Sequence, residues 1–182
     1  MEDVIANEFG WLDRIITNPE NSALFEDGQL LVIVNDLTTR WEQENRLSLL
    51  NELSATYGQE NLMLVVDRLI DVNCRKDWGE NGKQGDNSLA RFITLLWGPL
   101  TQAGFEFTSK QEGNITRFCV TRCPVADLAK KIGGEQWMYH LICLTDEPSV
   151  TGFNKDIRFS RTRTIMQGGA NCDHTYTDLT RG

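Results

Sequence analysis

The sequence predicts an α+β fold in which N-terminal helices pack on a C-terminal antiparallel sheet within a single domain. Apolar residues recur at helical spacing through the first half of the chain. Alternation of apolar and polar residues, which is typical of strands, begins at Phe105, and a turn signal at residues 112–114 predicts a hairpin. Because the helices come first and the strands later, the layout favours the α+β class. No internal repeat or linker marks a domain boundary in the sequence.

The helical pattern divides into segments separated by proline and glycine. Helices are expected over residues 2–17, 29–57, 59–74, 89–97, 124–131 and 135–144. Gly98 and Pro99 are expected to end the fourth of these helices, because proline disfavours helix at the residue before it. Residues 75–87 are polar and contain three glycines, so we interpret them as a loop. The sequence leaves open whether this loop covers a site or is a plain surface connection.

Four strands are expected in the second half of the chain. Their ranges are residues 105–108, 115–122, 157–165 and 172–176. Side chains alternate between the two faces of a strand, so Cys172, His174 and Tyr176 should share one face. In the preceding strand, Arg161 and Arg163 should share a face and lie near Cys172.

The composition excludes several classes of partner. The net charge of the 182-residue chain is −8, whereas nucleic acids and anionic membranes bind basic surfaces. The longest apolar run, residues 62–66, is too short to span a bilayer. Residues 1–3 lack the basic and apolar segments of a secretory signal, so we expect a cytoplasmic protein. A small-molecule substrate is the expected partner, and homo-oligomerisation stays open.

The cysteines are the residues most suggestive of chemistry. Their number is five, so at least one thiol lies outside any internal disulfide. Cytosolic thiols stay reduced and serve as buried apolar residues, metal ligands or nucleophiles. A thiol attacks as its thiolate, and neighbouring cations lower the thiol pKa. Arg122 adjoins Cys123, while Arg161 and His174 are expected near Cys172. This pattern favours nucleophilic attack on an electrophilic carbon.

Other interpretations of the same region stay open. A carboxylate such as Asp146 or Asp173 could hold the attacking water or transfer a proton. Cys143 lies in an apolar helical segment and could equally belong to the core, and so could Trp97 and the two histidines.

Zinc binding is a further alternative. Cys123, Cys143 and Cys172, together with His174 or an aspartate, are acceptable ligands for zinc. Their spacing matches no standard zinc module, and the sequence has no CxxC, HExxH, GxSxG or Walker pattern. We therefore expect no cofactor and rank zinc below a thiol nucleophile.

Several ordered segments in the last third of the chain resemble one enzyme family. They are residues 122–126, Cys143 with Asp146, and residues 152–154, 158–169 and 172–174. This set resembles the L-2-amino-thiazoline-4-carboxylic acid hydrolase family, most closely over residues 117–176. The resemblance implies hydrolysis of a carbon–nitrogen bond in an amidine-like group.

The resemblance also implies which residues form the site. They are Cys123, Cys143, Asp146 and Cys172, with Arg161, Thr164 and Asn154 as substrate-binding residues. Ser160 and Gly169 stand where the family often has acidic residues, which loosens the assignment of a substrate.

The expected protein is thus a bacterial-type hydrolase that cleaves a non-peptide C–N bond in a small thiazoline, isothiourea or guanidine derivative. A thiolate, Cys172 first and Cys123 second, would attack the sp² carbon, and Asp146 or His174 would deliver a proton to the leaving group. The alternatives are a zinc–thiolate hydrolase and a non-catalytic small-molecule-binding module. The second alternative rests on residues 168–176, which are also similar to the end of vinyl-reductase-type binding domains.

Overall fold

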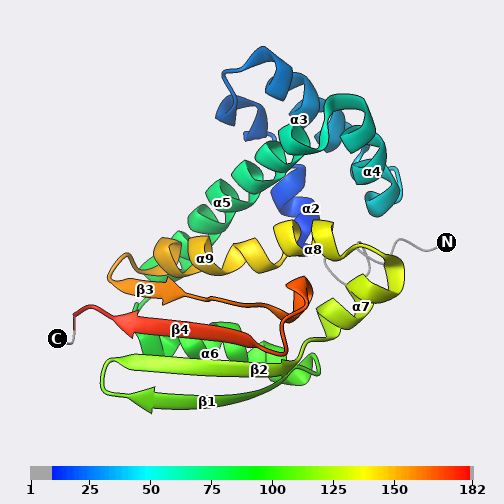
Figure 1. Cartoon of the computed structure of the whole chain (residues 1–182). Coiled ribbons are helices and arrows are strands. Elements are labelled where there is room, and N and C mark those ends of the chain that lie inside the picture. Colours follow the sequence, from blue (N-terminus) through cyan, green and yellow to red (C-terminus); the bar gives the residue numbers. More distant parts are fainter. Residues whose placement is uncertain (1–9, 181–182) are drawn as a thin grey trace. The chain divides into compact units, whose positions relative to one another are not determined.

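The computed structural model describes residues 10–180, which form two compact units (Figure 1). The first unit ends at Asn73 and the second begins at Cys74, and both positions lie within the long helix α5 (Gln59–Lys83). Within the described residues, no helix is long and apolar enough to cross a membrane.

The first unit is helical. It contains α2 (Trp11–Ile16), η1 (Asn21–Leu24), α3 (Gly28–Arg40), α4 (Arg46–Tyr57) and the first part of α5. Its apolar core includes Leu12, Ile16, Ile33, Val34, Leu37, Leu50, Leu53, Val65 and Leu69, all buried. Of the helix expected over residues 2–17, the part before residue 10 lies outside the described residues.

The single helix expected over residues 29–57 is in fact two helices, α3 and α4. Residues 41–45 form a turn between them, and the side chain of Asn45 accepts a hydrogen bond of 3.1 Å from the backbone N–H of Ser48. This contact caps α4, since the first N–H groups of a helix have no partner inside the helix. The apolar periodicity runs across the turn because Trp41, which lies in the turn, is buried like the apolar residues of α3 and α4.

A four-stranded antiparallel sheet forms the centre of the second unit, which confirms the α+β prediction. Its strands are β1 (Glu106–Glu112), β2 (Ile115–Arg122), β3 (Ile157–Ser160) and β4 (Cys172–Asp178). The strand order is β1-β2-β4-β3, so β4 lies between β2 and β3 (Figure 1). Phe118 of β2 pairs with His174 of β4, and Phe159 of β3 pairs with Tyr176. These pairs place aromatic side chains from three strands on one face of the sheet.

The helices that follow α5 are α6 (Leu89–Gln102), α7 (Pro124–Ile132), α8 (Glu135–Leu141), η2 (Cys143–Thr145), α9 (Asp146–Phe153) and η3 (Ile165–Gln167). Among them, α6 and α9 contact that face. Trp97 of α6 stacks on Phe118 with ring centroids 3.9 Å apart, and Phe92 lies 5.7 Å from Tyr176. Figure 1 shows α6 lying along the sheet behind β2 and β4. The alternating burial of β4 follows from this packing, with Cys172, His174 and Tyr176 on the covered face, as predicted.

The loop expected over residues 75–87 is wrong for most of its length, because α5 continues to Lys83. Two glycines explain the error. A Cβ on Gly82 would lie 2.3 Å from the carbonyl oxygen of Phe153, and a Cβ on Gly152 would lie 2.5 Å from that of Arg75. Gly82 and Gly152 therefore allow α5 and α9 to approach closely. Within residues 75–87, Gly82 does not mark a turn.

Two further boundaries differ from the prediction. Helix α6 continues past Gly98 and Pro99 to Gln102, so the proline lies inside its last turns. The strand expected over residues 157–165 ends at Ser160, and the chain then forms a loop and the short helix η3. The shorter strand leaves residues 161–164 in a loop beside the start of β4.

Candidate active site

Asp146, Arg161 and His174 form a partly buried polar network on the covered face of the sheet. Asp146 begins α9, Arg161 follows β3, and His174 lies in β4. The Asp146 carboxylate forms an ion pair with Arg161 and lies 3.2 Å from His174 Nε2. Because this carboxylate accepts from Arg161, we assign Nε2 as the second donor. The exposed fractions of the three side chains are 18%, 9% and 10% in that order.

Arg161 connects this network to Cys143. Its Nη2 donates a hydrogen bond of 3.2 Å to the backbone carbonyl of Cys143 in η2. The guanidinium also lies over the ring of Phe159, with Cζ 5.9 Å from the ring centroid. Arg161 is therefore held by a carboxylate, a carbonyl and an aromatic face, which fixes the position of its charge.

Cys172 and Cys123 each accept a hydrogen bond from a backbone N–H. Cys172 begins β4, and its Sγ accepts from Ile165 at 3.2 Å. Cys123 is the N-cap of α7, and its Sγ accepts from Ala126 at 3.4 Å. Backbone N–H donors stabilise a thiolate more than a thiol, so both contacts lower the thiol pKa.

The three cysteines share one electrostatic environment. The pKa of Cys143 responds to the charges of Cys123 and Cys172 as well as to those of Asp146 and Arg161. The pKa of Cys123 responds in turn to Cys172. Cys143 and Cys172 therefore lie within range of the Asp146 and Arg161 charges, and Cys123 lies within range of the other two thiols.

The pKa values of these thiols are raised, whereas the sequence analysis expected neighbouring cations to lower them. Burial is the main cause for Cys123, Cys143 and Cys172, and it raises the pKa of Cys143 furthest. Arg161 opposes burial at Cys143 and Cys172 without outweighing it. Arg122 instead pairs with acidic residues at the surface. All three thiols therefore hold their protons at neutral pH.

The loop after β3 is fixed to β4 by Asp173, on the opposite face from the thiols. Its carboxylate accepts hydrogen bonds from the backbone N–H groups of Thr162 and Arg163, each 2.9 Å long. Burial raises the pKa of Asp173, but these hydrogen bonds and that from the Thr162 hydroxyl together bring it below its ordinary value. The loop leads directly to Ile165, whose N–H contacts Cys172.

Thr164 shapes this loop, and its expected role in substrate binding stays a prediction. Its side chain is buried and caps η3 by accepting a hydrogen bond of 3.1 Å from the backbone N–H of Gln167. Its carbonyl accepts a 2.8 Å bond from Gly169 N–H, and a Cβ on Gly169 would lie 2.7 Å from that carbonyl oxygen. Thr164 and Gly169 therefore hold the tight turn that presents Ile165 to Cys172.

Two other residues from the sequence analysis lie outside the cluster. Asn154 follows the last residue of α9, about 12 Å from the start of this helix at 1.5 Å per residue, and its amide donates to the carbonyl of Asn87. Arg163 is 59% exposed and donates to Asn171 rather than facing Cys172. The strand ends at Ser160, so the alternation that placed Arg161 and Arg163 on one face does not apply.

A sequence model of the L-2-amino-thiazoline-4-carboxylic acid hydrolase family matches residues 39–176. The chain belongs to this family. Membership in the L-2-amino-thiazoline-4-carboxylic acid hydrolase family supports a hydrolase that acts on a thiazoline-type substrate. No curated protein and no solved structure matches the chain significantly.

The structure of this family member adds two residues that the sequence analysis did not place in the site. Trp97 of α6 contacts His174 edge-on, with ring centroids 5.2 Å apart. Tyr176 is fully buried, and its pKa responds to the charges of Asp146 and Arg161. The strand alternation had placed Tyr176 on the same face as Cys172 and His174, which was a usable signal. Trp97 had no comparable signal, because its position depends on the packing of α6.

The zinc alternative gains no support from the site of this hydrolase family member. Among residues 10–180, no group of three or more histidine, cysteine, aspartate or glutamate side chains is arranged to hold a metal ion.

A shallow surface pocket lined by Ser88, Asn114 and Asp178 lies at the other end of β4 from Cys172. It therefore belongs to a different region of the second unit.

Proposed function

We propose that this protein hydrolyses a C–N bond of a small, planar amidine-type compound through a covalent adduct on Cys172. The first candidate substrate is 2-amino-thiazoline-4-carboxylate, and isothiourea and guanidine derivatives are further candidates. The observation that carries the proposal is the grouping of three thiols with the Asp146–Arg161–His174 network in a member of this hydrolase family.

Cys172 is the preferred nucleophile because two groups favour its thiolate. The Ile165 N–H and the Arg161 charge both lower its pKa against the effect of burial. The Asp146 charge opposes the thiolate at both Cys172 and Cys143, and Arg161 favours it at both, but burial raises the pKa of Cys143 furthest. Cys123 ranks second, since it also accepts a backbone N–H.

A protonated thiol is compatible with this reaction, because an amidine is itself a base. The Cys172 proton passes to a nitrogen of the substrate as Sγ bonds to the central carbon. The ring C–N bond then breaks as the ring nitrogen takes a second proton from the exocyclic amino group. That group becomes a C=NH imine, and the carbon stays attached to Cys172. Water adds to this carbon, the carbon–Sγ bond breaks, and the thiol recovers a proton. The overall reaction consumes one water and leaves the enzyme unchanged.

The polar network supplies proton transfer in this scheme. Asp146 accepts a hydrogen bond from His174 Nε2, so the other ring nitrogen, Nδ1, carries a lone pair in the neutral imidazole. That nitrogen can take a proton from water and return it to the leaving thiol. Arg161 is paired with Asp146, and we assign it the role of orienting the carboxylate rather than of binding substrate directly.

A pair of serine substitutions tests the proposal. The variant Cys172→Ser should lose turnover of 2-amino-thiazoline-4-carboxylate while its melting temperature stays near that of the wild type. The matched control is Cys119→Ser, because Cys119 lies in β2 opposite Asp173 and faces away from the cluster. Full turnover in Cys172→Ser would remove this thiol from the mechanism. A wild-type protein that binds the compound without converting it would favour the non-catalytic binding module.

A further inference from the structure

Three buried polar atoms on the face of the sheet that carries Cys172 have no hydrogen-bond partner among the described residues. They are Trp97 Nε1, His174 Nδ1 and Tyr176 Oη. The exposed fractions of these residues are 4%, 8% and 0%. A buried polar group without a partner costs about 1–3 kcal/mol, so nearly all such groups in proteins are paired with protein, water or ligand.

The three atoms belong to one group of contacting rings. The ring of Trp97 lies 5.2 Å from that of His174 and 6.4 Å from that of Tyr176, measured between centroids. Phe118 and Phe159 complete the surroundings with apolar rings. The indole N–H is near enough to the Tyr176 oxygen to lower the tyrosine pKa, although the two atoms do not meet the geometry of a direct hydrogen bond. A bridging water commonly joins two polar atoms that are near each other but not directly hydrogen-bonded.

The hydrogen-bonding capacities of the three atoms complement those of one water molecule. The Trp97 indole is a donor, and His174 Nδ1 is an acceptor when Nε2 donates to Asp146. The Tyr176 hydroxyl can serve as either. A water molecule that accepts from Trp97 and donates to His174 satisfies both groups, and Tyr176 can fix its orientation.

We propose that Trp97, His174 and Tyr176 hold the hydrolytic water, an inference that rests on the proposed function. Cys172 and His174 are two positions apart on the same face of β4, a separation of about 7 Å along the strand. His174 Nδ1 takes a proton from this water as its oxygen bonds to the adduct carbon. The same proton goes to Sγ as the carbon–sulfur bond breaks. Trp97 and Tyr176 act as positioning residues.

Rapid-quench mass spectrometry of intact Tyr176→Phe protein with 2-amino-thiazoline-4-carboxylate tests this inference. The substitution removes the hydroxyl and keeps the ring, and Trp97→Phe is a second variant that removes the indole N–H. The matched control is Tyr57→Phe, which removes a hydroxyl bonded to Asp36 in the first unit. The adduct should form at the wild-type rate in both test variants. It should decay at about one tenth of the wild-type rate or below, so that it accumulates. Hydroxylamine, a stronger nucleophile than water, should restore its decay.

The possible outcomes separate this inference from the proposed function. Equal slowing of adduct formation and decay, or an unchanged decay rate, would reject the water site and leave the covalent mechanism in place. Turnover without any adduct in the wild type or the variants would reject the covalent mechanism and the water site together. Melting temperatures of Tyr176→Phe and Trp97→Phe near the wild-type value would show that altered decay does not result from partial unfolding.

Discussion

His174 Nε2 and Asp146 Oδ2 lie 3.2 Å apart, although 28 positions separate the two residues in the sequence. The contact joins the first residue of α9 to the middle of β4. It gives the imidazole a fixed orientation, with one nitrogen bonded to the carboxylate and the other directed elsewhere. A carboxylate paired with histidine in this way sets which nitrogen carries the proton.

Replacing Asp146 should therefore impair proton transfer. We expect Asp146→Asn to lower kcat about 100-fold, the lower end of what general acid–base catalysis contributes. It should also lower the free energy of unfolding by up to about 3 kcal/mol, because it leaves the nearly buried Arg161 without its charge partner. Steady-state kinetics and urea denaturation measure the two effects.

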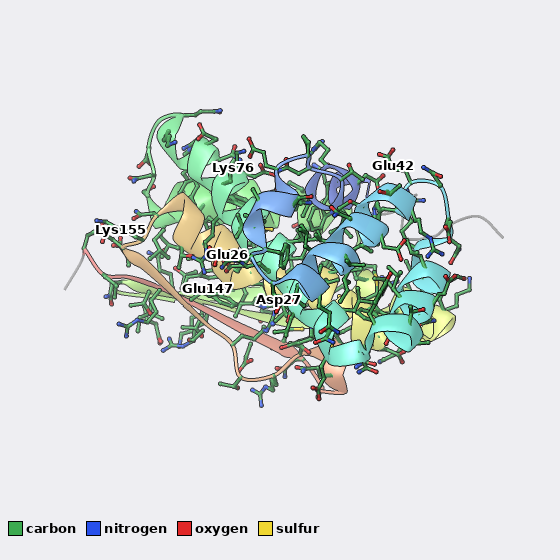
Figure 2. The ribbon with its side chains drawn as sticks, turned by 90° about the horizontal axis from the view of Figure 1, so that it is seen from above. Glu26, Asp27, Glu42, Lys76, Glu147 and Lys155 are labelled. Carbon is green, nitrogen blue, oxygen red and sulfur yellow. The ribbon has the colours of Figure 1, made fainter. Side chains whose placement is uncertain are left out.

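The control for this change is the next residue along the helix. Glu147 is labelled in Figure 2, is 51% exposed and pairs with Arg75. Exposed ion pairs contribute little, so Glu147→Gln should keep kcat and lose less than about 1 kcal/mol of stability. Equal losses of kcat in the two variants would show that the Asp146 carboxylate has no specific role.

The raised pKa of Cys143 should make stability depend on alkaline pH. Its folded-state pKa lies well above the ordinary value because of burial and the Asp146 charge. An unfolded chain therefore loses this proton first, at pH values above about 8.5, and the free energy of unfolding falls as pH rises from there. Cys143→Ala should show a shallower decline between pH 8 and 10 in urea denaturation, pH values chosen to bracket that ordinary pKa of about 8.5. Identical slopes for the two proteins would contradict the assigned shift.

The close approach of α5 and α9 should make Gly152 intolerant of a side chain. A Cβ at this position would lie 2.5 Å from a backbone oxygen and 2.7 Å from the Cα of Arg75, so one helix must move. Overpacking of this kind typically costs about 1–3 kcal/mol, and Gly152→Ala should lose at least that much stability. Gly28→Ala is the control, since nothing lies within 4 Å of its Cβ position at the first residue of α3. Alanine loses less backbone entropy than glycine on folding, so this variant should be no less stable than the wild type.

Features of the fold that depend on local geometry could be predicted from the sequence, whereas the packing of these glycines depends on a distant part of the chain. Strand alternation depends on local geometry, so the shared face of Cys172, His174 and Tyr176 was predicted correctly. Glycine supports either a turn or a close helix contact, and at Gly82 the adjacent backbone of Phe153 decides for the close contact.

The pKa values of the thiols were harder to predict, because they too depend on contacts with distant parts of the chain. The sequence indicated cations beside Cys172 but contained no measure of its burial, which outweighs the nearby Arg161 charge. Thr164 and Asn154 illustrate a second limit. The resemblance named them as substrate-binding residues, which stays a prediction, and it gave no sign that Thr164 caps η3 or that Asn154 donates to the carbonyl of Asn87.

Asp173 should support the site from the other side of the sheet. Its carboxylate accepts several hydrogen bonds from the loop that carries Ile165, so Asp173→Asn should cost about 1–3 kcal/mol at pH 7. Its folded-state pKa is lowered, so its contribution is present above the unfolded-state value of about 3.9 and is lost as pH falls through the folded-state value. The stability difference from the wild type should therefore shrink in acid. Asp156→Asn, at an exposed carboxylate, is the control for the loss of a charge and should change stability at pH 7 by less than about 0.5 kcal/mol.

Peptide mapping of the covalent adduct is the most direct test of the central claim. Trypsin separates the three thiols into residues 123–130, 132–155 and 164–181, and the last of these contains only Cys172. Wild-type protein quenched with acid during the first turnover of 2-amino-thiazoline-4-carboxylate should carry added mass on residues 164–181 and on neither of the other peptides. Turnover at the full rate with residues 164–181 unmodified at every time point would contradict the account.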